Sequence, residues 1–233
     1  MKLRLGLCSD THGKPLPDFE SADMVLHAGD LYEFDGIPND EHAVRIVEYL
    51  RSHRVVFVRG NHDCTDPLEL MKADLSGQVA PLGPGLWLVG IGFGCHGEGG
   101  SVGLPSEGHL LPICRRVCEQ AVARFKQGDH CILITHYPAK VPEAMPLNRG
   151  RSTEGFFFDC VRVVCEALQP LVVIQGHTHS FNGKVLESGG IQYCWPGPRG
   201  MTLDVDCDTW QVSLSAATPR NPRKTQGPTL FDV

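Results

Sequence analysis

Five short segments of the chain carry side chains that can bind metal ions. Each segment follows a run of apolar residues, and in three of them a glycine directly precedes the polar residues. In chain order the segments are Asp10-Thr11-His12, Gly29-Asp30, Gly60-Asn61-His62-Asp63, His136 and Gly176-His177-Thr178-His179. Their donor atoms are imidazole nitrogens and carboxylate or amide oxygens, without a thiolate. Such a set suits Mn, Fe, Zn, Co or Ni better than Ca or a purely structural zinc.

The number of candidate ligands predicts two ions in one centre. The candidates are Asp10, His12, Asp30, Asn61, His136, His177 and His179. One ion needs fewer protein donors, whereas two ions would each have about four if one carboxylate bridged them, with room left for water and substrate. Asp10 and His12 are two residues apart, so in an extended chain they face one side and can bind the same ion. We therefore expect two divalent metal ions per chain, with Mn²⁺ as the favoured metal.

Buried strands are predicted to position these residues. Apolar, largely β-branched runs precede the five segments, at residues 3–7, 24–27, 55–58, 131–134 and 171–174. The carboxyl ends of strands in an open α/β sheet share one crevice, so side chains far apart in the chain can converge there. Gly29, Gly60 and Gly176 lack a Cβ atom, which we expect to let the chain turn sharply toward the ions.

The rest of the pattern predicts an α/β fold with two packed sheets flanked by helices. Apolar residues recur every three or four positions in residues 40–52, 113–126 and 154–168, as in helices. Four later runs have strand character without helices between them, which predicts a second sheet or an antiparallel edge; they are residues 87–92, 184–194, 201–206 and 210–216. Glycine- and proline-rich stretches predict loops around the site, at residues 79–85, 94–108 and 137–151.

Taken together, the motifs D-x-H, G-D, G-N-H-D, H and G-H-T-H resemble the calcineurin-like metallophosphoesterases. The resemblance covers residues 10–179, about three quarters of the chain. It implies a four-layer αββα sandwich of two mixed sheets, and hydrolysis of phosphate esters by in-line attack of a hydroxide that bridges two ions. It also implies one ion on Asp10, His12 and His179, a second on Asn61, His136 and His177, and Asp30 as the bridge.

The same resemblance implies roles for residues beside the ions. His62 is expected to be the general acid that protonates the leaving oxygen, and Asp63 to orient it. Arg59 matches a version of the motif in which the arginine touches substrate phosphate, although pairing with a surface carboxylate is an equal alternative. His96, in a His-Gly turn, is a candidate substrate-binding residue of a nearby loop.

Composition limits the partners and the compartment. The chain has 233 residues and a formal net charge of -6, which argues against non-specific binding of nucleic acid through global charge. It has no apolar run of the roughly 18 residues that a membrane span needs, and its start reads as a strand, not a signal peptide. Its ten cysteines form no C-x-x-C pair, so we expect small buried side chains in a reducing cytoplasm.

The chain is expected to form one domain over residues 1–217, followed by a disordered tail at residues 218–233. A short docking motif ending in Leu230-Phe231 is the alternative interpretation of the tail.

The substrate is expected to be a phosphodiester or a phosphomonoester, with diesters favoured because few residues remain for a closing cap. Two other classes are alternatives: a non-catalytic, metal-binding scaffold for protein interactions with the same fold, and a single-metal hydrolase of another fold. A scaffold could dispense with His62 and some ligands, whereas this chain has them all.

Overall fold

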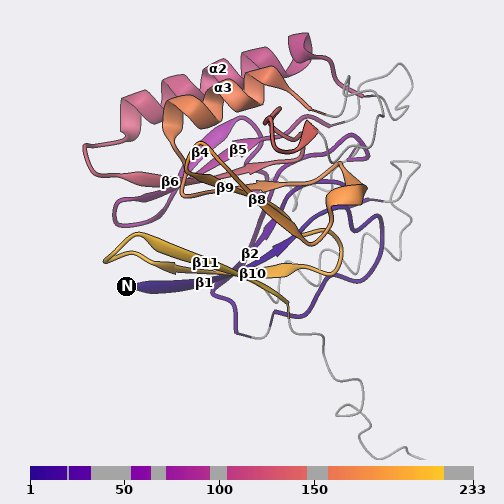
Figure 1. Ribbon diagram of the computed structural model, residues 1–233, viewed down its shortest axis with the longest axis horizontal. Coiled ribbons are helices and arrows are strands. Elements are labelled where there is room, and N and C mark those ends of the chain that lie inside the picture. The colour runs from indigo at the N-terminus through magenta and orange to yellow at the C-terminus, as the bar shows by residue number, and fades with distance from the viewer. Residues whose placement is uncertain (20, 33–53, 64–71, 95–103, 146–156, 218–233) are drawn as a thin grey trace, which may run out of the picture.

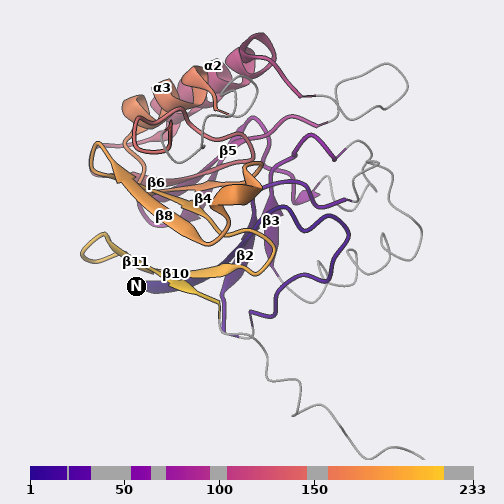
Figure 2. The ribbon, with the colours of Figure 1, turned by 45° about the vertical axis from the view of Figure 1, so that its right-hand side comes forward.

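A computed structural model describes residues 1–19, 21–32, 54–63, 72–94, 104–145 and 157–217. Within them, two β-sheets lie one above the other, and two helices cover the outer face of one sheet (Figures 1 and 2). The predicted helix at residues 40–52, His96 and the C-terminal tail lie outside the described residues. The helices described thus account for one of the two outer layers of the expected sandwich.

The first sheet has five strands in the order β11-β10-β1-β2-β3. Its strands β1, β2 and β3 run parallel, whereas β10 and β11 are antiparallel to their neighbours. The parallel strands supply the carboxyl ends at which the first three ligand segments lie. The strands are β1 (Lys2–Cys8), β2 (Met24–His27), β3 (Val55–Phe57), β10 (Met201–Asp206) and β11 (Gln211–Ala216).

The second sheet has six strands in the order β4-β5-β6-β7-β9-β8. The four inner strands are parallel, and both edge strands are antiparallel. The strands are β4 (Gln78–Gly83), β5 (Leu86–Ile91), β6 (His130–Thr135), β7 (Val172–Gln175), β8 (Lys184–Ser188) and β9 (Ile191–Trp195). Both sheets are mixed, so the predicted α/β class with two mixed sheets is confirmed.

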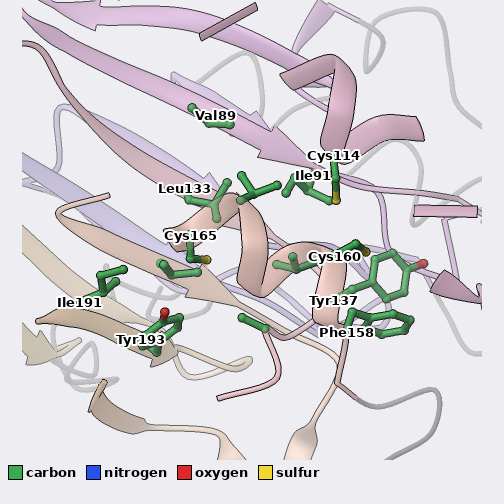
Figure 3. Packing of buried hydrophobic residues seen from close by; sticks show 14 of the residues in the cluster. Val89, Ile91, Cys114, Leu133, Tyr137, Phe158, Cys160, Cys165, Ile191 and Tyr193 are labelled. Atoms are coloured by element: carbon green, nitrogen blue, oxygen red, sulfur yellow. The ribbon is translucent and has the colours of Figure 1, made fainter. Parts of the chain in front are cut away.

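Burial on both faces of the second sheet explains why its inner strands are continuous apolar runs. In β6, Ile132 and Ile134 face the five-stranded sheet, whereas Cys131 and Leu133 face the helices. Figure 3 shows the second of these clusters, where Leu133 lies close to Cys165 of α3 and Ile91 lies close to Cys114 of α2. The eight described cysteines are free, and six of them are buried, as the sequence predicted.

The two helices pack on each other and begin at points that the sequence did not predict. Helix α2 (Glu107–Arg124) starts six residues before the predicted residue 113 and contains Pro112. Proline usually marks the end of a helical pattern, but here it falls in the second turn of the helix. Helix α3 (Asp159–Leu168) starts after the predicted residue 154, because Glu107 of α2 accepts the N–H groups of Asp159 and Cys160 and so caps its first turn.

Two of the sequence predictions for the second sheet were wrong. Residues 79–85 were expected to be a loop, but most of them form β4, which pairs with β5; proline is tolerated there because β4 is an edge strand. The expected strand at residues 184–194 is a hairpin of β8 and β9. Gly189 and Gly190 both have positive φ at its turn, which favours a two-residue connection.

Within the described residues, no helix combines the length and the apolar character needed to cross a membrane.

Candidate metal centre

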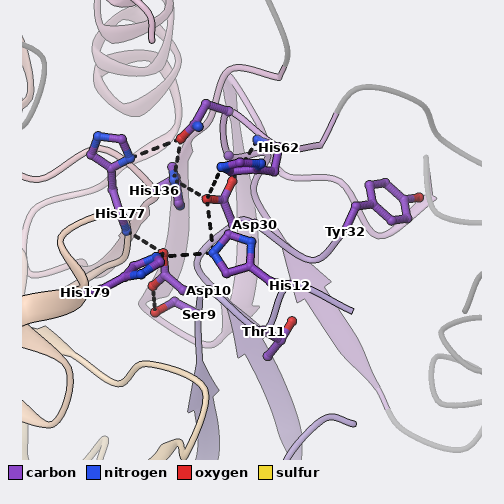
Figure 4. Close-up of polar contacts among 12 residues, drawn as sticks. Ser9, Asp10, Thr11, His12, Asp30, Tyr32, His62, His136, His177 and His179 are labelled. Carbon is purple, nitrogen blue, oxygen red and sulfur yellow. Dashed lines mark hydrogen bonds and ion pairs between the residues drawn. The ribbon is translucent and has the colours of Figure 1, made fainter. Parts of the chain in front are cut away.

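The five ligand segments meet where strands of both sheets end (Figure 4). Asp10, Asp30 and Asn61 follow β1, β2 and β3, and His136 and His177 follow β6 and β7. His179 begins the short 3₁₀ helix η4 (His179–Phe181). The structure therefore brings together all seven residues that the sequence identified as candidate ligands.

One group of donors consists of Asp10, His12 and His179. Its ligand atoms lie within 4.8 Å of one another. The Nε2 atoms of His12 and His179 are 3.2 Å apart, and His179 Nε2 is 3.4 Å from Asp10 Oδ1. Two imidazole nitrogens that face each other beside a carboxylate are a suitable donor set for a divalent transition metal.

A second group consists of Asn61, His136 and His177. The Oδ1 atom of Asn61 is 3.2 Å from His136 Nε2 and 3.0 Å from His177 Nδ1. Asp30 lies between the two groups, because its Oδ2 is 3.3 Å from His136 Nε2 and 3.8 Å from His12 Nε2. A carboxylate in this place can contact an ion in either group.

The charge states of these residues suit cations. Burial alone would raise the pKa of both carboxyl groups, but the histidines beside them hold the pKa values of Asp10 and Asp30 below the ordinary value. Burial lowers the pKa of His12 to about 4, so its imidazole is neutral, as a ligand must be. Burial also opposes protonation of His136, but Asp30 raises its pKa to about 9; a metal ion would take the place of that proton.

The backbone at the site is held in unusual conformations. Asp10, His12, Asp30 and His177 have φ values of 52°, 44°, 57° and 66°, a left-handed region that non-glycine residues rarely adopt. Such strain concentrates at functional sites. Of the three glycines, Gly29 itself has a positive φ of 84°. Gly60 and Gly176 do not, and they are needed for another reason.

That reason is space between the ligand segments. A Cβ atom on Gly60 would collide with the carboxylate of Asp30, and one on Gly176 would lie 2.6 Å from the carbonyl oxygen of Ala28 and 2.8 Å from the His136 ring. The sequence correctly indicated that glycine is required at these positions. The cause at Gly60 and Gly176 is close packing and not a sharp turn.

His62 lies at the margin of the cluster. Its side chain is 14% exposed, and its Nε2 is 3.9 Å from Asp30 Oδ2. Its ring packs edge-on against His12 with centroids 4.9 Å apart, and its backbone N–H donates to Asp30 Oδ1 at 2.9 Å. His62, His12 and Asp30 also lie close enough to form a further set of metal donors. The geometry thus accommodates His62 either as a proton donor or as a ligand.

Asp63 and Arg59 each have hydrogen-bond partners within the described residues. The carboxylate of Asp63, expected to orient His62, accepts four backbone N–H groups at 2.7 to 3.2 Å. Arg59 Nε donates to Asp74 Oδ2 at 2.7 Å, which is the ion pair named as the alternative to phosphate binding. Both residues border a cavity of about 350 Å³ that Ser76 and residues 92–94 also line.

Sequence reasoning missed two contacts that orient the ligands. Ser9 Oγ donates to Asp10 Oδ2 at 2.5 Å, and His136 Nδ1 lies 2.9 Å from the Ala28 carbonyl oxygen. A proton on His136 Nδ1 would leave Nε2 to face the site, as is usual for metal-binding histidines. The position of Ser9 directly before Asp10 was the available signal for the first contact. The second joins residues 108 positions apart, which no local pattern reports.

Comparisons with known proteins indicate the family and support the fold of this chain. The sequence matches the calcineurin-like phosphoesterase family over residues 3–181. Among solved structures, the chain is similar to TT1561 of Thermus thermophilus, with a TM-score of 0.60 and 14% identity over 93% of this chain and 99% of that one. It is also similar to the phosphopantetheinyl hydrolase PptH from Mycobacterium tuberculosis, with a TM-score of 0.54 and 14% identity over 83% and 88% of the two chains. A comparison with curated proteins gives no significant match.

The family model covers most of the chain, so this protein belongs to the calcineurin-like phosphoesterase family. Membership supports metal-dependent hydrolysis of phosphoesters, and the non-catalytic scaffold is not favoured. The solved structures, at 14% identity, support the fold alone.

Proposed function

We propose that this protein is a dinuclear phosphoesterase that cleaves phosphodiesters in preference to phosphomonoesters, with Mn²⁺ as its metal. The observation that carries the proposal is the position of Asp30. Its Oδ2 atom lies 3.8 Å from His12 and 3.3 Å from His136, so one carboxylate serves two donor groups. Within this proposal, Asp10, His12 and His179 hold one ion, and Asn61, His136 and His177 hold the other.

The chemistry follows from this arrangement. Bound divalent ions supply an activated water and positive charge opposite the phosphoryl oxygens. His62 donates a proton to the leaving oxygen, for which its partly exposed position at the margin of the cluster is suitable. Asp63 acts on the backbone and holds the Asp30 turn in place, because its carboxylate binds the N–H groups of that turn.

One observation supports the preference for diesters. The cavity beside Arg59 provides space near the site for a second ester group. Arg59 is proposed to form part of the wall of this cavity, where it is held by its ion pair with Asp74. The substrate-binding role of His96 stays a prediction.

The test is a substrate panel with purified protein that has been treated with EDTA and reloaded with Mn²⁺. The panel contains p-nitrophenyl phosphate, bis-p-nitrophenyl phosphate, cyclic nucleotides, single-stranded and duplex nucleic acid, and a phosphopantetheinyl ester, since one structural neighbour is named as a phosphopantetheinyl hydrolase. We expect activity to be lost with EDTA, to return with Mn²⁺, and to favour diesters in kcat/KM. A monoester preference of about tenfold or more would overturn the diester assignment, and no metal-dependent hydrolysis of any ester would overturn the function.

A further inference from the structure

The turn that carries two of the proposed ligands has a strained backbone. Asp10 and His12 have φ values of 52° and 44°, which lie in the left-handed region. Thr11 is the residue between them. Residues other than glycine keep such a conformation only where their surroundings hold it. What holds this turn therefore decides where two metal donors point.

Backbone hydrogen bonds hold the two ends of the turn. The N–H of Asp10 donates to Gly29 O at 2.9 Å, and that of His12 donates to Asp30 O at 3.1 Å. Thr11, between them, is held by its side chain. It is fully buried, and its Oγ1 lies 3.0 Å from Nε2 of His27. In Figure 4 Thr11 lies apart from the ligand cluster, below His12.

His27 is the residue that this hydroxyl meets. It is the last residue of β2 and is 1% exposed. Its other ring nitrogen, Nδ1, has no hydrogen-bond partner in the part of the chain that the structure describes. A buried polar atom without a partner is unfavourable, so packing alone does not account for a histidine here. The contact of His27 with Thr11 does account for it.

We propose that His27 and Thr11 are positioning residues that fix the Asp10–His12 turn, and with it the ion held by Asp10, His12 and His179. This inference rests on the proposed function, because it concerns one of the two proposed ion sites. Neither residue is a candidate ligand, and both act through the turn. The ligands Asn61, His136 and His177 come from other strands, so loss of the contact should affect the two ions unequally.

The experiment compares Thr11→Val, which keeps the shape of the side chain but removes the hydroxyl, with Thr11→Ser, which keeps the hydroxyl. Mn²⁺ binding to the metal-free full-length chain is measured by titration calorimetry. We expect Thr11→Val to keep one ion at wild-type affinity and to bind the other about tenfold or more weakly, which is typical for loss of a contact behind a metal ligand. Thr11→Ser should bind both ions within about twofold of wild type.

His27→Phe tests the same contact from the other side. It retains a ring of similar size, so it carries the test if Thr11→Val does not give the circular dichroism spectrum of a folded protein. The double variant Thr11→Val/His27→Phe should bind the weakened ion no more weakly than the more affected single variant, because the shared contact is already lost. Additive losses would overturn the pairing.

The outcomes separate this inference from the function on which it rests. Two ions bound by wild type and by Thr11→Val with equal affinities would overturn the inference and leave the proposed function intact. Equal weakening of both ions would also overturn it, because a general loss of folding predicts that result. Failure of the wild-type protein to bind two Mn²⁺ ions would contradict the proposed function and the inference with it.

Discussion

The carboxylate of Asp63 is joined directly to the backbone of Asp30, whose N–H donates to Asp63 Oδ2 at 2.9 Å. The same oxygen accepts the N–H of Gly60 at 2.7 Å, while Oδ1 accepts those of Leu31 and Tyr32 at 2.9 and 3.2 Å. Asp63 therefore ties the turn after β2 to the turn after β3. The proposed bridging residue takes its position from this buried link.

Asp63→Asn is expected to destabilise the protein even without metal. Each carboxylate oxygen accepts two N–H groups. In the asparagine variant, an amide nitrogen replaces one of these oxygens, so two hydrogen bonds are lost and the N–H groups of the amide face two other N–H donors. Hydrogen bonds to charged groups contribute about 1.5–3 kcal/mol each, so the free energy of unfolding should fall by about 3 kcal/mol or more. Urea unfolding of the metal-free protein measures this.

Asp204→Asn is the matched control for that variant. Asp204 pairs with Arg4 at 2.7 Å, with both side chains nearly half exposed, and such surface pairs contribute about 0–1 kcal/mol. Its free energy of unfolding should stay within about 1 kcal/mol of wild type. Similar losses in the two variants would mean that the Asp63 link is no more important than a surface ion pair.

Asp30→Ala is expected to disrupt both ions, because Asp30 Oδ2 lies between His12 and His136. His12→Ala and Asn61→Ala remove donors from one group each, so they should weaken mainly one ion. Elemental analysis of the purified variants counts the metals. An Asp30→Ala protein with two tightly bound ions and near-native turnover would rule out the bridging assignment.

Gly60→Ala is expected to impair the site through a single methyl group. Gly60 has no positive φ, but a Cβ atom there would collide with the Asp30 carboxylate. Asp30 would have to move, so Mn²⁺ affinity should fall by about tenfold or more. Titration calorimetry measures the change.

Gly108→Ala provides the control for Gly60→Ala. Gly108 lies in the first turn of α2, and a Cβ atom there has only an ordinary contact with Ser106 at 3.5 Å. Alanine should stabilise the helix by up to about 1 kcal/mol and leave metal affinity unchanged. Unaltered Mn²⁺ binding in both variants would show that the Asp30 carboxylate adapts to the methyl group.

Much of the fold was predictable because its signals are local. The runs that end at Asp10, Asp30 and His136 are apolar since their strands are buried, and the polar residue follows where burial ends. β4 was missed because Pro81 and nearby glycines resemble a loop, although an edge strand tolerates them. The start of α3 was missed because its cap, Glu107, comes from another helix.

The ligand set was also predictable, but its supports were not. Asp10, His12 and the other donors are typical metal-binding residues in a recognisable order. The partners that orient them are ordinary residues in other elements: Ala28 contacts His136 through its carbonyl oxygen, and His27 contacts Thr11. Such contacts depend on the tertiary packing of strand ends, which local residue patterns do not report.

The His62→Ala variant distinguishes three roles for this residue, beginning with metal content. His62 Nε2 lies 3.9 Å from Asp30 Oδ2, close enough for His62 to belong to a donor set with His12 and Asp30. A ligand role predicts loss of an ion, whereas a general acid or a phosphate-binding residue leaves both ions in place. Elemental analysis decides this first question, and we expect two ions. His130→Ala, at the start of β6 and thus at the opposite end of that strand from His136, is the control for loss of a histidine elsewhere.

The leaving group then separates an acid from a phosphate-binding residue. Displacement at phosphorus releases an alkoxide from an alkyl or nucleoside ester, and expelling so basic a group without a proton is costly, whereas p-nitrophenolate leaves readily. A general acid contributes roughly 10²–10⁴-fold where protonation is needed. His62→Ala should therefore lose most of its kcat on alkyl or nucleoside esters and far less on p-nitrophenyl esters. A phosphate-binding role predicts similar losses on both, because the phosphoryl group is common to them. Equal losses with both ions retained would move His62 from proton donor to binding residue.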